Sequence, residues 1–169
     1  DAQESRGLGD VYKRQLEHTY QQFREASGKS WLDFDYLLFH VPFPKMAYKA
    51  LKKLYELETA AREEKDLPSL EAVYQEKTLP TLWANALIGN AYSSSLYISL
   101  AGFLEQLTPE NEGATLGMFS YGSGSCAEFF SARVRPQAAG HGAAIGLKQQ
   151  LADRREINYS TCLLYTSPS

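Results

Sequence analysis

The clearest pattern along the chain is a change from helical to strand-like spacing of apolar residues within its first forty positions. Leu16 to Ala26 has the spacing of an amphipathic helix, which Gly28 ends as a C′ glycine. Trp31 to Phe39 closes on apolar and aromatic residues, which indicates a strand buried on both faces. Pro42 and Pro44 then end this strand.

A second helix is predicted from Pro44 to about Arg62, because proline suits the first turn of a helix. Its apolar residues form one stripe, and its lysines lie on a neighbouring face. The stripe consists of Met46, Ala50, Leu54 and Leu57, and the lysines are Lys45, Lys49, Lys52 and Lys53. A charged stretch with a proline, Glu63 to Ser69, separates this helix from the rest.

The second half of the chain adds helices and a hairpin. Helices are expected at Leu70–Lys77, Ala91–Leu107 and Ala138–Ala152, an apolar segment spans Leu82–Ile88, and strands are expected at Thr115–Tyr121 and Ala127–Val134. A glycine-rich turn joins the two strands, which predicts an antiparallel hairpin. Strands that alternate with helices before a closing hairpin predict an α/β fold with a mixed sheet.

The predicted helix Ala91–Leu107 is apolar or small almost all round, which is typical of a helix buried in a large core. Its serines and alanines allow neighbouring backbones to approach closely. Such a surface needs cover from another domain or subunit. The pattern therefore suggests that part of the protein lies outside these residues.

The composition is that of one ordinary globular domain: 169 residues, 44% hydrophobic, 22% charged, with a formal net charge of -3. This charge provides no global field for nucleic acid, so an anionic partner needs a local basic patch. No apolar run is long enough to span a membrane. Cys126 and Cys162 have neither metal-ligand spacing nor a disulfide pattern, which favours a reducing cytoplasm, and the N-terminus has no apolar signal core.

The two ends differ from the middle of the chain. Residues 1–15, DAQESRGLGDVYKRQ, and residues 160–169, STCLLYTSPS, lack clear periodicity and resemble translated sequencing adaptor. We therefore hypothesise that residues 16–159 are the natural half-domain, that both ends are non-native, and that the gene continues on both sides. The alternative is a pair of disordered tails.

Two groups near the first strand are candidates for ligand binding. His40 ends the strand, where α/β folds place ligands, and a helix N-terminus follows four residues later. A lone histidine on an apolar strand is more often a core residue paired with a backbone carbonyl. Lys45 and Lys49 form a cationic ridge suited to the phosphates of a nucleotide-bearing ligand such as coenzyme A, or else a solvated helix face.

Two further candidates come from the second half. Asn90 in IGNAYSSSLY is either a helix N-cap or an amide that faces a pocket. Ser123 in SYGSGS lies between two glycines, so its backbone N–H can approach a ligand oxygen closely, although Gly-Ser turns are common in hairpins. SYGSGS is not a nucleophile elbow, because a strand follows it rather than a helix.

The segments FHVPFPKMAYKA, GNAYSSSLYISL and FSYGSGSCAEFFS together resemble hydroxymethylglutaryl-CoA synthases of the bacterial type, in the family's order over nearly all of residues 16–159. The resemblance implies the C-terminal half of a thiolase-like αβαβα fold that works as a cytoplasmic homodimer. It also implies condensation of acetyl-CoA with acetoacetyl-CoA to 3-hydroxy-3-methylglutaryl-CoA, in the mevalonate pathway. Coenzyme A thioesters are substrates there, and no cofactor, nucleic acid or membrane is involved.

The same resemblance suggests a role for each candidate. His40 matches the histidine that holds the acetoacetyl group, and Asn90 the asparagine that binds the same group. Ser123 matches the serine whose main-chain N–H helps to form the oxyanion site, and Lys45 and Lys49 match lysines near the coenzyme A phosphates. The family's acetylated cysteine and general-base glutamate lie in the missing N-terminal half, so the chain alone is expected to be inactive.

Cys126 does not match the nucleophile and is expected to pack in the interior. Two alternatives stay open. One is a relative used in polyketide β-branching, which takes acyl groups from carrier proteins, although Lys45 disfavours it. The other is a non-catalytic half-domain that only binds coenzyme A or a partner chain.

Overall fold

The computed structural model of the chain describes residues 2–60, 67–122, 124 and 126–161. Its helices are α1 (Ala2–Ser27), α2 (Lys45–Thr59), α3 (Leu70–Val73), α4 (Trp83–Ile88), α5 (Ser95–Glu105), α6 (Ala138–Ile145) and α7 (Leu147–Ala152). Its strands are β1 (Tyr36–Phe39), β2 (Thr115–Gly122) and β3 (Cys126–Arg133). The predicted α/β class is confirmed.

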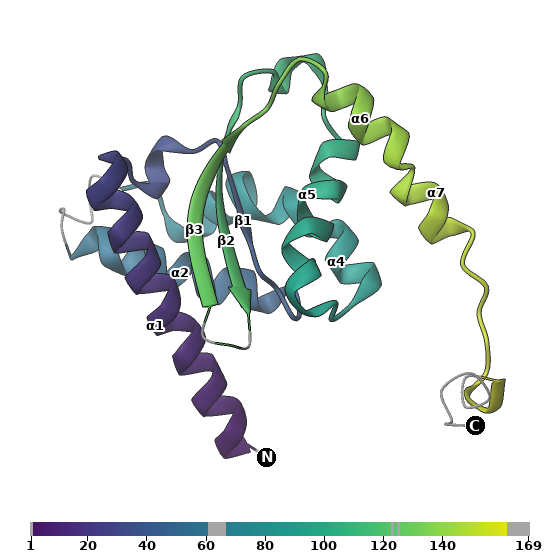
Figure 1. Cartoon of the computed structure of the whole chain (residues 1–169), viewed down its shortest axis with the longest axis horizontal. Coiled ribbons are helices and arrows are strands. Elements are labelled where there is room, and N and C mark those ends of the chain that lie inside the picture. Colours follow the sequence, from purple (N-terminus) through teal and green to yellow (C-terminus); the bar gives the residue numbers. More distant parts are fainter. Residues whose placement is uncertain (1, 61–66, 123, 125, 162–169) are drawn as a thin grey trace.

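The three strands form one mixed sheet in the order β1-β2-β3. β1 pairs with β2 in parallel, with Phe39 opposite Phe119. β2 and β3 form the predicted antiparallel hairpin, from Thr115 opposite Arg133 to Gly122 opposite Cys126. Figure 1 shows α1 and α2 on one side of this sheet and α4 and α5 on the other.

Each face of the sheet has its own apolar core, as the alternation of side chains along a strand requires. Leu37 and Phe39 pack with residues of α1 and α2. Leu38, between them, packs with Leu96 and Phe103 of α5. These three residues of β1 are 0% exposed, so the prediction of a strand buried on both faces is confirmed.

Helix α1 is longer than the helix predicted over Leu16–Ala26, because it already begins at Ala2. Its residue Tyr12 is buried in the core. The helix runs without a break across the proposed junction after residue 15. The natural origin of residues 1–15 and 160–169 stays a prediction.

Two helix predictions need correction. The expected helix Ala138–Ala152 is split into α6 and α7, because Gly146 between them takes a left-handed φ of 62°. The helix expected from Ala91 begins only at Ser95, after a 3-10 turn over Tyr92–Ser94.

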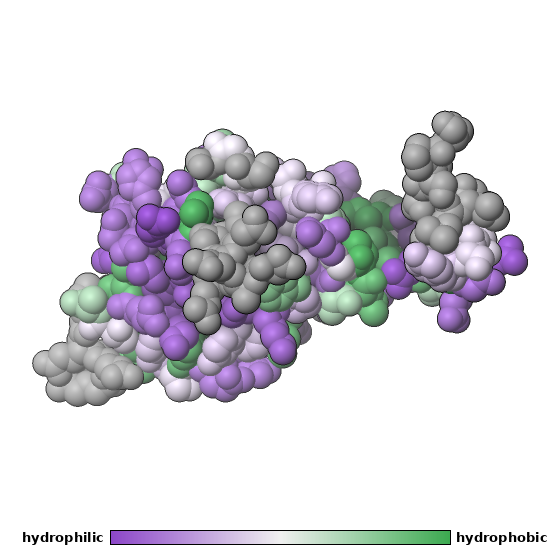
Figure 2. All heavy atoms as spheres, turned by 90° about the horizontal axis from the view of Figure 1, so that it is seen from below, coloured by the Kyte–Doolittle hydropathy of each residue, from purple (hydrophilic) through white to green (hydrophobic). Residues whose placement is uncertain are grey.

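The expectation that this helix is buried all round is only partly right. Ser95, Leu96, Ser99, Gly102 and Phe103 are its buried residues. Tyr97 is 59% exposed, and on the neighbouring α4 Leu87 is 53% exposed. Figure 2, which views the molecule from below, shows hydrophobic surface exposed among hydrophilic side chains.

Cys126 was expected to pack in the interior, and this was wrong. It is the first residue of β3, where its side chain is exposed. The end of a hairpin offers no apolar layer to cover it. Among the described residues, no helix combines the length and apolarity needed to cross a membrane.

Candidate functional site

His40 lies immediately after β1 and continues its pairing, because its backbone N–H donates to the Phe119 carbonyl at 2.8 Å. Its side chain is buried, and Nδ1 lies 3.1 Å from the hydroxyl Oγ of Ser95. Burial lowers the pKa of the imidazole below its ordinary value, because desolvation penalises the charged ring. His40 is therefore a neutral imidazole near neutral pH.

Two tyrosine rings surround His40. The Tyr121 ring centroid lies 5.6 Å from the imidazole centroid, and that of Tyr12 lies 6.3 Å away. The Tyr12 hydroxyl also donates a 2.8 Å hydrogen bond to the His40 carbonyl. The histidine thus sits in an aromatic, poorly hydrated setting, where a polar contact with a ligand counts for more than in water.

A cavity of about 720 Å³ opens beside these tyrosines. It is lined by Gly9, Asp10, Tyr12, Lys13, Pro42, Phe43, Met46, Lys49, Asn90 and Tyr121. Four of them, from Gly9 to Lys13, belong to the part of α1 that we predict to be non-native. The others come from the loop after β1, the first turns of α2, the turn before α5 and the end of β2. Its mainly apolar wall with a few polar groups is typical of a small-molecule site.

The two predicted lysines differ in position. Lys49 lines the cavity. Lys45 is exposed at the start of α2 and is not among the lining residues. At the helix N-terminus, the N–H groups of Met46 and Ala47 already donate to the carbonyls of Phe43 and Pro44 at 2.9 and 3.0 Å. A phosphate here would therefore bind mainly to the lysine side chains and not to these backbone N–H groups.

Asn90 lines the same cavity from the turn before α5. Its Oδ1 accepts a 2.9 Å hydrogen bond from the backbone N–H of Tyr92, a residue with a positive φ of 52°. It therefore stabilises the turn before α5 and does not cap that helix. The side-chain amide donors of Asn90 have no acceptor among the described residues, so they remain available for a ligand oxygen.

Ser123 lies outside the described residues. The hairpin that carries it ends with Gly122 opposite Cys126. Of the five predicted site residues, the structure thus places Lys49 and Asn90 on one cavity, His40 beside it and Lys45 on the outer surface. Their functional roles stay predictions.

Sequence reasoning missed the residues that complete this setting. Ser95 was read only as a small residue that permits close packing, yet its hydroxyl meets His40. Tyr121 was read as a strand residue, yet it lines the cavity. The run of three serines that ends at Ser95 could have indicated the contact of Ser95, since hydroxyls in a buried segment need hydrogen-bond partners.

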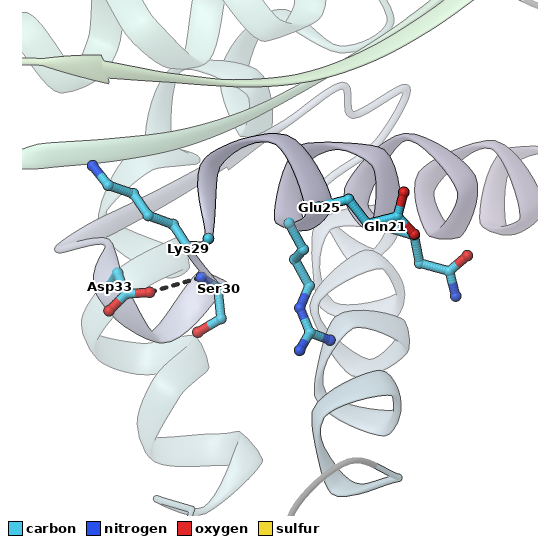
Figure 3. A pocket seen from close by; sticks show the side chains of 7 residues that line it. Gln21, Glu25, Lys29, Ser30 and Asp33 are labelled. Carbon is cyan, nitrogen blue, oxygen red and sulfur yellow. Dashed lines mark hydrogen bonds between the residues drawn. The ribbon is translucent and has the colours of Figure 1, made fainter.

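A second cavity, of about 340 Å³, lies at the C-terminal end of α1 (Figure 3). There the Ser30 N–H donates to the Asp33 carboxylate at 2.7 Å, and Arg24 pairs with Glu58 at 3.3 Å. These side chains make contacts within the protein that stabilise the fold. The cavity contains none of the predicted site residues.

Comparison with known proteins identifies the family. A family model described as hydroxymethylglutaryl-coenzyme A synthase C terminal matches residues 63–161. A hydroxymethylglutaryl-CoA synthase of Enterococcus faecalis is 34% identical over 125 residues, which cover 74% of this chain and 30% of the relative. The mitochondrial enzyme of Homo sapiens is 31% identical over 169 residues, covering 76% and 33%.

Solved structures agree in fold. MvaS in complex with 3-hydroxy-3-methylglutaryl coenzyme A has a TM-score of 0.84 at 30% identity, over 96% of this chain and 44% of that one. The curacin pathway HMG synthase in complex with acetyl donor-ACP has a TM-score of 0.79 at 31% identity, over 97% and 38%. These neighbours have the thiolase-like fold, so the three-stranded sheet is part of that architecture.

The chain spans about a third of the length of the curated relatives it matches. The family match nevertheless covers more than half of this chain. It extends from the residues after α2 to the end of the described segment. The chain therefore belongs to the hydroxymethylglutaryl-coenzyme A synthase C-terminal family.

Proposed function

We propose that the protein of which this chain is part condenses acetyl-CoA with acetoacetyl-CoA to 3-hydroxy-3-methylglutaryl-CoA, in the mevalonate pathway. The observation that carries this proposal is the placement of His40 beside a cavity that Lys49 and Asn90 line. The similarity to the synthase of Enterococcus faecalis supports it.

The chemistry follows from a neutral, buried imidazole. Attack of an acetyl carbanion on the acetoacetyl ketone places negative charge on the ketone oxygen. A neutral N–H donor aimed at that oxygen stabilises the charge as it develops, and a dry setting strengthens the effect. His40 is the catalytic residue of this chain in the proposal.

The other residues bind the two ends of the ligand. Asn90 donates from its amide to the acyl group, and the main-chain N–H of Ser123 completes the oxyanion site. Lys49 and Lys45 attract the phosphates of coenzyme A. Asn90 and Lys49 both line the cavity, which supports a ligand with an acyl group and phosphates.

We further propose that the chain alone does not turn over, because the family resemblance assigns the acetylated cysteine and the general-base glutamate to an N-terminal half. The complete enzyme is proposed to be a cytoplasmic homodimer with coenzyme A thioesters as its only small-molecule requirement. Sedimentation of the complete protein tests the dimer.

A second candidate is a synthase that takes its acyl groups from carrier proteins. Structural neighbours include the curacin pathway HMG synthase bound to donor-ACP. Lys45 favours free coenzyme A, since a cation there suits the coenzyme's phosphates. Supplying the complete enzyme with acetyl-CoA and, separately, with an acetylated carrier protein distinguishes the two substrates.

The deciding experiment measures release of free coenzyme A by the complete enzyme from acetyl-CoA and acetoacetyl-CoA. We expect turnover by the complete enzyme, none by the 169-residue chain, and a loss of roughly 100-fold or more in kcat for His40→Ala, as when one oxyanion donor is removed. A matched control is His141→Ala, an exposed histidine on α6. Full activity of His40→Ala would show that the site lies elsewhere.

A further inference from the structure

A buried chain of polar groups lies behind His40. Ser95, at the start of α5, is 0% exposed. Its Oγ accepts a 3.1 Å hydrogen bond from the Val41 backbone N–H and lies 3.1 Å from His40 Nδ1. One hydroxyl thus contacts both the backbone and the side chain at the point where β1 ends.

The geometry selects one tautomer of the imidazole. The Ser95 oxygen accepts from the Val41 N–H, so the hydroxyl proton can point toward another acceptor. Among the described residues, His40 Nδ1 lies in position to accept it. The opposite tautomer would place an N–H on Nδ1 and leave the buried hydroxyl proton without an acceptor. A buried donor without a partner is costly, so Nδ1 accepts and the proton resides on Nε2.

Two further residues hold Ser95 in place. Asn85 of α4 donates from Nδ2 to the Ser95 carbonyl at 2.8 Å, and Ser99 donates to Asn85 Oδ1, also at 2.8 Å. Asn85 is 1% and Ser99 0% exposed. Satisfied buried networks of this kind fix a single arrangement of their members, so the first turn of α5 cannot turn away from His40.

We propose that Ser95 is a positioning residue that holds His40 as the Nε2–H tautomer, and that Asn85 and Ser99 secure Ser95 in that position. The value of this arrangement for catalysis rests on the proposed function, because an Nε2–H donor is what the developing alkoxide needs. The tautomer itself does not depend on that function. Failure of the two ideas can therefore be told apart.

The test is long-range ¹H–¹⁵N NMR of the imidazole rings in the 169-residue chain. The chain has three histidines, and the spectrum of His40→Gln identifies the signals of His40 by their disappearance. We expect one unprotonated nitrogen at Nδ1 and a protonated Nε2. A wild-type spectrum with the proton on Nδ1 would overturn the proposal without any variant.

Two substitutions add to this measurement. Ser95→Ala should give His40 signals averaged between both tautomers, whereas Ser94→Ala, a change at an exposed neighbouring serine, should leave them unchanged. A Ser95→Ala chain that keeps the wild-type pattern of His40 would contradict the proposal. Should that variant not fold, Ser99→Ala serves instead and should broaden the His40 signals.

In the complete enzyme, Ser95→Ala should lower kcat on the order of 10-fold with little change in KM, as loss of one buried hydrogen bond to a catalytic group does. Ser95→Thr, which keeps a hydroxyl, should restore the tautomer and most of the rate. An altered tautomer with unchanged kcat would show that Ser95 positions His40 and that His40 does not act in the reaction.

Discussion

The Tyr20 hydroxyl donates a 2.9 Å hydrogen bond to Glu58 Oε1, which joins α1 to α2 across 38 residues of sequence. The same hydroxyl accepts from the Trp31 backbone N–H at 2.9 Å. Arg24 pairs with the Glu58 carboxylate at 3.3 Å. A buried carboxylate thus lies beneath α1, compensated by a phenol and a guanidinium.

Tyr20→Phe should therefore destabilise the chain by about 1–3 kcal/mol, because it leaves the buried Trp31 N–H without its acceptor and removes one hydrogen bond from the buried Glu58 carboxylate. The free energy of unfolding in urea measures this. Tyr55→Phe is the matched control, since the Tyr55 hydroxyl makes no hydrogen bond within the described residues, and it should change stability by much less. Equal effects of the two changes would contradict the role of the buried network.

Stability should depend on pH through His40. Its folded-state pKa lies below the unfolded value of about 6.5, so the unfolded chain takes up the proton first. Stability is then fully present above about pH 6.5 and falls, by at most roughly 1.4 kcal/mol per pH unit, as pH drops toward the folded-state pKa.

Urea unfolding at about pH 7.5 and about pH 5.5 tests this dependence. His40→Gln removes the titrating group and should flatten the loss over this range. Asp35, whose pKa is lowered mainly by a hydrogen bond from the Thr115 N–H, acts in a more acidic window. An unchanged slope in His40→Gln would show that another group is responsible.

Gly117 in β2 has no room for a side chain. A Cβ there would lie 2.6 Å from Phe34 Cδ2 and 2.8 Å from Leu37 Cδ2. Gly117→Ala should cost about 1–3 kcal/mol by overpacking. Gly140→Ala, on α6 with nothing within 4 Å, should be neutral or stabilising by about 0.5–1 kcal/mol. Thermal unfolding of both variants provides the comparison, and a tolerated Gly117→Ala would mean that this core is loosely packed.

Coenzyme A binding should distinguish the two lysines. Both lysines are exposed, but Lys49 lines the cavity and Lys45 does not. We expect Lys49→Ala to weaken coenzyme A binding by about 10-fold, as loss of a charged hydrogen bond does, and Lys45→Ala to have a smaller effect. Titration calorimetry with Lys52→Ala, an exposed lysine outside the lining, gives the control. A larger effect of Lys45→Ala would place the phosphates outside the cavity.

Most of the fold follows from local patterns. The apolar run of Leu37 and Leu38 predicts a strand buried on both faces, and the two runs around SYGSGS predict the hairpin. The limits of helices were less predictable. Gly146 divides the last helix because it adopts a left-handed φ in the folded chain. A glycine in an alanine-rich stretch can also continue a helix, so the sequence alone does not predict this break.

The sequence by itself determined the α/β class, the family resemblance and the candidacy of His40, Lys49 and Asn90, because these depend on residue order and type. Only the tertiary structure decided that Lys49 and Asn90 share a cavity while Lys45 does not. It alone placed Ser95 against His40, 55 residues away. Contacts between distant segments depend on how two layers of helices pack on one sheet, and no local spacing encodes that packing.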